Sequence, residues 1–118
     1  MGCGSGIQTA TLILYGAKTV TCVDINESAL KISKKMIETN FTNAKVTFTQ
    51  SNLFEKIKKS KTFDVIVFNP PYVPSEKIKW VEVDGGKKGR EVIDVFLAQL
   101  TSRLTKNGVC FLLQSSLN

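Results

Sequence analysis

The chain has 118 residues, 42% of them apolar, and no apolar run long enough to span a membrane. This length predicts one domain, and the lack of a basic and hydrophobic leader predicts a cytoplasmic protein, with the nucleus as a second compartment. Because the chain has no histidine, it excludes His–Asp triads, histidine-ligated metals and imidazole proton transfer.

The net charge is +6, from 16 basic and 10 acidic residues. Most lysines fall on or beside predicted helices, where a solvated polar face is a simpler explanation than a polyanionic partner. The three cysteines match no zinc or redox spacing, so we expect buried, reduced thiols at Cys3, Cys22 and Cys110.

Glycines occupy every second position at the start of the chain, at Gly2, Gly4 and Gly6. Glycine lets the backbone adopt positive φ and lets a ligand approach closely. Residues 7–15 are predicted to form a helix that ends at Gly16. This G-x-G-x-G pattern alone is a weak signal of nucleotide binding.

A strand is predicted over residues 19–24, and it ends in Asp24. A carboxylate at this distance from a glycine loop can accept hydrogen bonds from both hydroxyls of a ribose. The alternative role is a helix cap, which Asn26 suits better. The following helix, over 28–39, is predicted to be amphipathic. Its positions at inward-facing helical spacing are Ala29, Leu30, Ile32, Ser33, Met36 and Ile37.

The next strand is predicted over residues 45–50, and a short helix over 53–60. In a doubly wound sheet, Asn52 would lie at the same carboxyl edge as Asp24 and Asn69. There its amide oxygen could accept from an adenine amino group, while the next backbone N–H donates to the ring. A simple turn before the helix explains Asn52 equally well.

The stretch 63–72 begins with a strongly apolar strand, predicted over 63–68 and expected to be buried on both faces. Two prolines then stiffen a backbone that has lost two N–H donors. An amide side chain, a carbonyl and an aromatic ring therefore lie side by side at the strand end, which suits a flat group carrying an NH2. The residues of this corner are Asn69, Pro70, Pro71 and Tyr72.

Residues 73–88 are predicted to form a charged loop with Trp80 exposed or folded over the site. A helix over 91–104, a turn at 106–108 and a buried strand over 109–114 follow. The basic residues after the corner could steer an acidic or RNA-associated substrate toward it. They are Lys77, Lys79, Lys87, Lys88 and Arg90.

Helices that alternate with strands predict an α/β fold with a doubly wound, mostly parallel sheet. Both ends look truncated, because no strand precedes the glycine loop and the chain stops just after a strand. We therefore expect residues 1–118 to be a single, partial domain.

Taken together, these motifs resemble those of class I S-adenosylmethionine-dependent methyltransferases with a Rossmann-like fold. The tetrapeptide Asn69–Tyr72 is typical of members that methylate a nitrogen conjugated to a planar system, either a glutamine amide or a nucleobase amine. The segment 85–92 resembles the eukaryotic and archaeal branch of the HemK family, which methylates the glutamine of the Gly-Gly-Gln motif in a translation termination factor. The chain departs from the family pattern in three ways. The family's acidic residue before the glycine loop would precede Met1 and is absent, and the strands expected after Gln114 are missing. Asn52 replaces the commoner Asp.

The resemblance implies S-adenosylmethionine as cofactor, S-adenosylhomocysteine as product, no metal, and a small zinc-binding activator subunit as partner. A DNA or RNA adenine N6-methyltransferase and an inactive cofactor-binding or partner-binding module stay open as alternatives. Direct nucleic-acid binding has little support beyond Tyr72 and Trp80. The implied catalytic residues are Asn69, Pro70, Pro71 and Tyr72. The implied cofactor-binding residues are Gly2, Gly4, Gly6, Asp24, Ile25, Asn52, Leu53 and Asn69.

Overall fold

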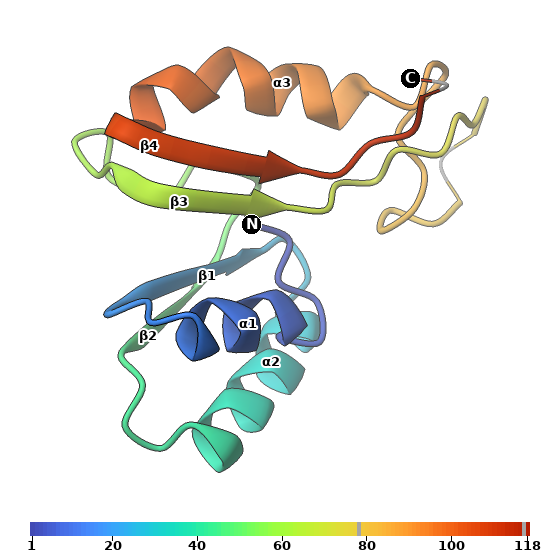
Figure 1. Cartoon of the computed structure of the whole chain (residues 1–118). Coiled ribbons are helices and arrows are strands. Elements are labelled where there is room, and N and C mark those ends of the chain that lie inside the picture. Colours follow the sequence, from blue (N-terminus) through green and yellow to red (C-terminus); the bar gives the residue numbers. More distant parts are fainter. Residues whose placement is uncertain (78, 117) are drawn as a thin grey trace. The chain divides into compact units, whose positions relative to one another are not determined.

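Two pairs of parallel strands organise the chain in a computed structural model that describes residues 1–77, 79–116 and 118 (Figure 1). The pairs belong to two compact units, Met1–Lys58 and Lys59–Asn118. The predicted α/β class with parallel strands is confirmed, although the strands form two pairs where the sequence predicts one continuous sheet. No helix in the described part of the chain combines the length and apolarity needed to cross a bilayer.

The first unit contains two helices beside a parallel pair, and both helices contact β1 (Figure 1). Its strands pair in register from Val20 opposite Val46 to Asp24 opposite Gln50. Two buried cysteines and a leucine form its core, against which two side chains of β2 pack. The elements are α1 (Ile7–Leu14), β1 (Val20–Asp24), α2 (Glu27–Asn40) and β2 (Val46–Gln50).

Local signals set the helix ends in this unit. The N–H of Gly16 donates to Ile13, the N–H of Ala17 donates to Leu12, and Gly16 has a φ of 92°, so α1 ends as the glycine predicts. Asn26 caps α2 by accepting from the N–H of Ser28 at 2.9 Å.

One inward stripe of α2 is confirmed and part of the second is wrong. Leu30, Ser33 and Ile37 are buried, whereas Ile32 is 60% exposed. Residues two apart on a helix point in very different directions, so a helix that packs on one face cannot bury both Leu30 and Ile32.

The predicted helix over 53–60 is also wrong, because the structure has a run of turns there. Leu53 has a φ of 47°, which a right-handed helix cannot include. The N–H of Lys56 donates to the Ser51 hydroxyl at 3.0 Å, so a side chain takes the place of a helical carbonyl. Leu53, Phe54 and Ile57 are nevertheless buried.

The second unit places α3 along the parallel pair of β3 and β4 (Figure 1). The ring centroids of Phe68 and Phe96 lie 4.8 Å apart, which joins the strand to the helix. After β3 ends, the N–H of Leu113 still donates to the Phe68 carbonyl at 3.0 Å. The elements are β3 (Phe63–Phe68), α3 (Glu91–Leu100), the short 3-10 helix η1 (Thr101–Arg103) and β4 (Leu104–Leu112).

Three boundary or burial predictions in this unit are wrong. The helix ends at Leu100, and the residues predicted as a turn at 106–108 lie inside β4, where an irregularity lets β4 carry extra residues opposite the start of β3. The expected burial on both strand faces is not found, because Val65 is 40% and Phe111 62% exposed. α3 packs on the face of Ile66 and Phe68, which explains why that face is the buried one.

The cysteines agree with the expectation of reduced thiols. All three are free, and Cys3 and Cys22 are buried as expected. The expected burial is wrong for Cys110, which is half-buried because β4, in the described part of the chain, pairs along one edge alone. The Thr9 hydroxyl lies 2.8 Å from the Cys22 sulfur. The hydrogen bond with Cys22 and burial raise the pKa of the Cys3 thiol, so this side chain stays protonated and serves the core.

Candidate functional site

The glycine loop needs glycine at all three alternating positions. Gly2, Gly4 and Gly6 have φ values of 60°, 49° and 90°, a region that other residues adopt only with strain. The loop is tied to the end of β1, since the N–H of Cys3 donates to the Val23 carbonyl at 3.1 Å and the N–H of Gly6 donates to the Cys3 carbonyl at 2.8 Å. A side chain built on Gly4 would meet no atom within 4 Å, so the space beside the loop is open to a ligand.

Asp24 connects this loop to the start of α2. One carboxylate oxygen accepts from the N–H of Gly4 at 3.0 Å, and the other accepts from the N–H of Asn26 at 2.9 Å. Each oxygen can accept a further hydrogen bond, so these contacts leave room for the predicted ribose role. Ile25 follows directly and is 54% exposed.

Asn52 and Leu53 lie beside the same edge. The N–H of Ser51 donates to the Asp24 carbonyl at 3.0 Å, which continues the strand pairing by one step. The Asn52 amide nitrogen donates to Glu55 at 2.8 Å, which fixes the orientation of its side chain. The structure thus brings together, at the carboxyl edge of β1 and β2, every cofactor residue predicted in the first unit.

The Asn-Pro-Pro-Tyr corner belongs to the second unit. Asn69 is exposed, Pro70 is buried, and Pro71 and Tyr72 are half-buried. In the part of the chain that the structure describes, no hydrogen bond reaches the Asn69 side chain or the Pro70 carbonyl. The two acceptors that the sequence singles out are therefore available to an external donor.

Backbone hydrogen bonds hold the following loop against the corner. Val73 donates its N–H to the Val83 carbonyl at 3.0 Å and accepts from the N–H of Gly85 at 2.9 Å. Trp80 is 64% exposed, so of the two predicted placements the exposed one is found. Sequence reasoning missed buried Asp84, whose carboxylate accepts from the N–H groups of Lys79 and Trp80 at 2.7 and 2.9 Å. The available signal was an acid just before a Gly-Gly pair, a pattern typical of ordered turns.

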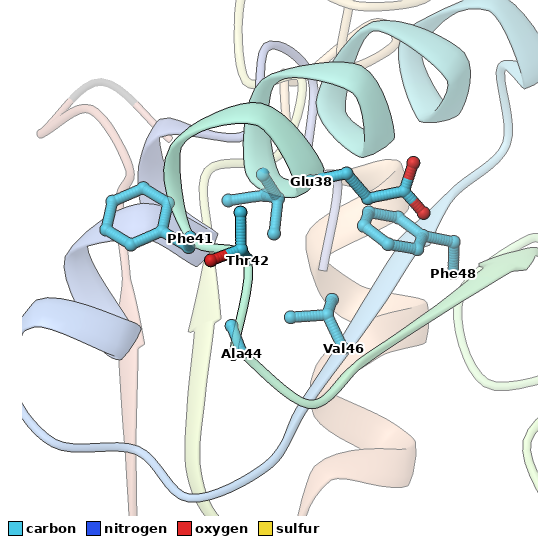
Figure 2. A pocket seen from close by; sticks show the side chains of 7 residues that line it. Glu38, Phe41, Thr42, Ala44, Val46 and Phe48 are labelled. Atoms are coloured by element: carbon cyan, nitrogen blue, oxygen red, sulfur yellow. The ribbon is translucent and has the colours of Figure 1, made fainter.

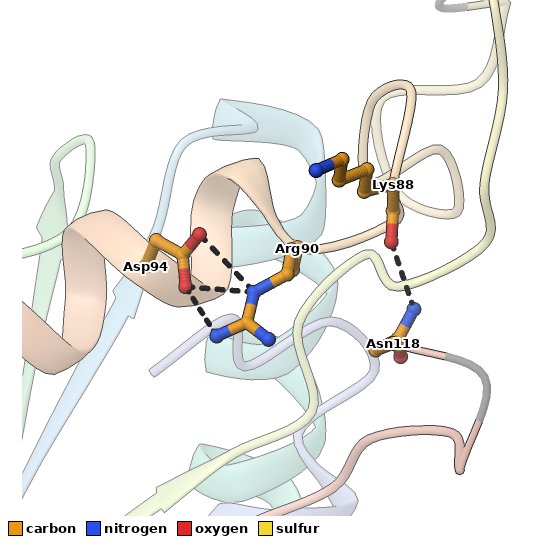
Figure 3. Close-up of polar contacts among 4 residues, drawn as sticks. All are labelled: Lys88, Arg90, Asp94 and Asn118. Carbon is orange, nitrogen blue, oxygen red and sulfur yellow. Dashed lines mark hydrogen bonds and ion pairs between the residues drawn. The ribbon is translucent and has the colours of Figure 1, made fainter.

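One member of the predicted basic group is engaged in an ion pair. Arg90 donates from two guanidinium nitrogens to Asp94, with the shorter contact at 2.7 Å (Figure 3). This contact lowers the pKa of Asp94 and stabilises the first turn of α3. Lys87 and Lys88 are exposed, so the cations that could steer a substrate are the lysines.

A hollow of about 310 Å³ lies between the end of α2 and the start of β2 (Figure 2). Phe41, Val46 and Phe48 give it an apolar wall, and Glu38 is its acidic side chain. It contains none of the predicted site residues and lies at the amino end of β2, whereas ligands of parallel sheets bind at the carboxyl end. We therefore do not assign the cofactor to it.

Asp84 is expected to make the loop behind the corner sensitive to acid. Hydrogen bonds from Trp80 and Lys79 lower its pKa. A carboxylate with a lowered folded pKa stabilises the fold above its unfolded pKa, about 4, and that contribution is lost as the pH falls through the folded value. Trp80 is the single tryptophan, so we expect an acid transition in its fluorescence below about pH 4. Asp84→Asn should loosen the loop already at neutral pH and remove this transition.

The matched control is Glu82→Gln, which removes an exposed acid from the same loop and should keep the transition. A wild-type signal that stays constant down to about pH 2, well below the ordinary carboxyl pKa, would contradict the role of Asp84.

Positive-φ glycines before a helix, with an acid at the end of the next strand, are typical of nucleotide-binding α/β proteins. Comparison with known proteins gives the family. The model of the methyltransferase small domain family matches residues 1–117, and the chain belongs to this family. A methyltransferase family implies S-adenosylmethionine as the methyl donor. The Rossmann-like methyltransferase fold expected from the sequence is confirmed by this match.

Several curated proteins are similar to the chain. A protein of Methanocaldococcus jannaschii, provisionally named protein N5-glutamine methyltransferase, is 40% identical over 123 residues, covering 99% of this chain and 60% of that protein. A release factor glutamine methyltransferase of Rhodopirellula baltica is 34% identical over 120 residues, covering 92% and 40%. An rRNA N(6)-adenosine-methyltransferase of Caenorhabditis elegans is 30% identical over 111 residues, covering 92% and 46%.

The chain thus spans between 40% and 60% of the length of these relatives. The resemblance to class I methyltransferases of the HemK family is confirmed by the family match and by the names of the glutamine-methylating relatives.

Proposed function

We propose that the chain is the catalytic part of an S-adenosylmethionine-dependent N-methyltransferase that acts on a glutamine side-chain amide, in the Gly-Gly-Gln motif of a translation termination factor. The observation that carries this proposal is the corner at Asn69 and Pro70, with two acceptors that no hydrogen bond reaches within the described residues. Relatives named for glutamine methylation support the choice of acceptor. The family match runs through both units, which supports one partial methyltransferase domain over residues 1–118.

The residues of the first unit fit the cofactor. The open space beside Gly4 would admit the methionine part, and Asp24 retains acceptor capacity for the ribose hydroxyls. The Asn52 amide oxygen would accept from the adenine amino group, while Ile25 and Leu53 would contact the adenine ring. When bound, this cofactor supplies an electrophilic methyl group on a sulfonium.

The residues of the second unit would activate the acceptor. A carboxamide nitrogen is a poor nucleophile because its lone pair is delocalised. If Asn69 Oδ1 and the Pro70 carbonyl accept the two N–H hydrogens, they orient the nitrogen lone pair and stabilise the positive charge that grows on nitrogen. Pro71 and Tyr72 would pack on the amide plane, and the proton would leave to solvent after transfer.

Two partners follow from the proposal. The termination factor is the substrate, and Lys87 and Lys88 would attract an acidic or RNA-associated surface on it. A small zinc-binding subunit is the proposed activator. The apolar side chains that alternate on β4, Val109 and Phe111 at 48% and 62% exposure, support a partner that covers apolar surface. We place the protein in the cytoplasm, where such a substrate would be met.

An adenine N6-methyltransferase is the second candidate, because the same two acceptors suit an exocyclic amine and the Caenorhabditis elegans relative is named for adenosine methylation. An inactive cofactor-binding module is the third. Base methylation generally needs an extruded base and aromatic stacking, and exposed Trp80 is the aromatic side chain of the loop that could contribute.

Labelled S-adenosylmethionine, offered with a termination factor and an adenine-containing oligonucleotide together, tests the choice. We expect label in the termination factor, and no label when its Gly-Gly-Gln glutamine is replaced by glutamate. Label in the oligonucleotide alone would support the adenine reading instead. Calorimetric binding of S-adenosylmethionine without transfer to either acceptor would identify an inactive module.

A further inference from the structure

The side chain of Asn118 joins two segments that meet behind the proline corner. Its amide nitrogen donates to the Tyr72 carbonyl at 2.8 Å and to the Lys88 carbonyl at 3.3 Å. Its amide oxygen accepts from the N–H of Ser115 at 2.9 Å, which orients the amide. Figure 3 shows Asn118 with its nitrogen directed at the Lys88 carbonyl.

Two glycines allow this close contact. Gly89 has a φ of 69°, and a side chain there would collide with the Tyr72 carbonyl and the Asn118 amide nitrogen. A side chain on Gly85 would lie 2.7 Å from the Pro71 carbonyl, a backbone atom that cannot rotate away. The loop backbone therefore lies directly against the two carbonyls that follow Pro70.

The prolines explain why the corner needs the hydrogen bonds from Asn118. Pro70 and Pro71 have no N–H, so the middle of the corner has no backbone donor. Contacts to its carbonyls therefore contribute more to holding it in place. Asn118 donates a hydrogen bond to the Tyr72 carbonyl, and the backbone at Gly85 packs against the Pro71 carbonyl. The Pro70 carbonyl is left available to the N–H of a substrate amide.

We propose that Asn118 is a positioning residue for methyl transfer: by joining the Tyr72 and Lys88 carbonyls, it holds the peptide planes after Asn69 so that the Pro70 carbonyl points at the substrate NH2. This inference rests on the proposed function. The role needs a side chain that donates two hydrogen bonds and accepts one at short reach, which describes an asparagine amide. A carboxylate of the same shape would face two carbonyls with no hydrogen to donate.

The test measures kcat and KM for the termination factor, together with the affinity for S-adenosylmethionine. We expect Asn118→Asp and Asn118→Ala to lower kcat about tenfold or more, with KM and cofactor affinity within about twofold. The reason is that a misplaced Pro70 carbonyl would slow methyl transfer itself and leave binding nearly unchanged. Gln114→Ala, which removes an exposed amide from the same segment, should match the wild type. Asn118→Gln, which keeps the donors, should recover part of kcat.

Hydrogen exchange of the Val73 and Gly85 amides is a second measure of how firmly Asn118 holds this region. The exchange should be faster in Asn118→Ala than in the wild type. A kcat equal to that of wild type in both variants overturns the positioning role and leaves the proposed function intact. A uniform loss of cofactor affinity and folded structure in both variants, with no recovery by Asn118→Gln, overturns it as well. Absence of methylation by the wild type overturns the proposed function and, with it, this inference.

Discussion

Asn69→Ala is expected to lower the single-turnover rate of methyl transfer by about 10²–10³-fold, the usual cost of removing one preorganised group that stabilises developing charge. The reason is that alanine leaves one acceptor, the Pro70 carbonyl, for the two hydrogens of the amide. The side chain is exposed and makes no hydrogen bond among the described residues, so the substitution should leave the fold unchanged. Rapid-quench measurement with saturating cofactor reads the chemical step directly.

Cofactor affinity separates this effect from a binding defect. The other proposed cofactor residues belong to the first unit and are untouched by the substitution, so most of the affinity for S-adenosylmethionine should survive. Asn107→Ala, which removes another exposed asparagine from the second unit, serves as the matched control and should keep the wild-type rate. An unchanged transfer rate in Asn69→Ala would contradict the role of its side chain and the mechanism built on it.

Short-range signals in the sequence predicted short-range structure well. Gly16 ends α1 and Asn26 caps α2, because each acts on backbone groups within a few residues. The apolar run at 63–68 became β3, and Asn69 lies just beyond its end as expected. These features depend on local φ, hydrogen bonding and apolar content, all of which a sequence displays.

One error came from a local contact, and the others came from features that depend on distant residues. The helix predicted over 53–60 did not form, because the left-handed Leu53 and the Ser51 hydroxyl decided the local conformation. A Lys-Asn-Gly tripeptide normally indicates a turn, yet the register shift between Phe63 and Val65 lets these residues lie inside β4. Burial of both strand faces depends on what covers them, which an apolar run does not reveal.

The candidate site follows the same division. Residues of the glycine loop, Asp24 and the proline corner carry their chemistry in side chains or in backbone freedom, so they could be found by motif and spacing. The anchor behind the corner could not, because Asn118 and Tyr72 are 46 residues apart and meet through a main-chain carbonyl. Sequence patterns record which side chains are present, whereas this contact depends on where the backbone returns.

Gly6→Ala is expected to lower the free energy of unfolding of the first unit by about 2–4 kcal/mol, the sum of a backbone cost and a packing cost. At a φ of 90°, any residue with a Cβ is strained. The added methyl would also lie 2.8 Å from the Ser33 hydroxyl and 3.2 Å from the Ser33 Cα, and Ser33 is fully buried in α2. The Met36 methyl, also 2.8 Å away, belongs to a flexible side chain and can move, but the backbone of α2 cannot.

Gly4→Ala is the control that separates the two costs. Gly4 also has positive φ, at 49°, but a Cβ there would meet nothing within 4 Å, so we expect the backbone cost alone, about 1–2 kcal/mol. Hydrogen exchange of the β1 amides under native conditions reads the stability of this unit by itself. Equal losses in the two variants would show that the loop does not pack against α2 at Gly6. A larger loss in Gly6→Ala would mean that one glycine of the loop serves its close packing on the helix, while the other leaves space for a ligand.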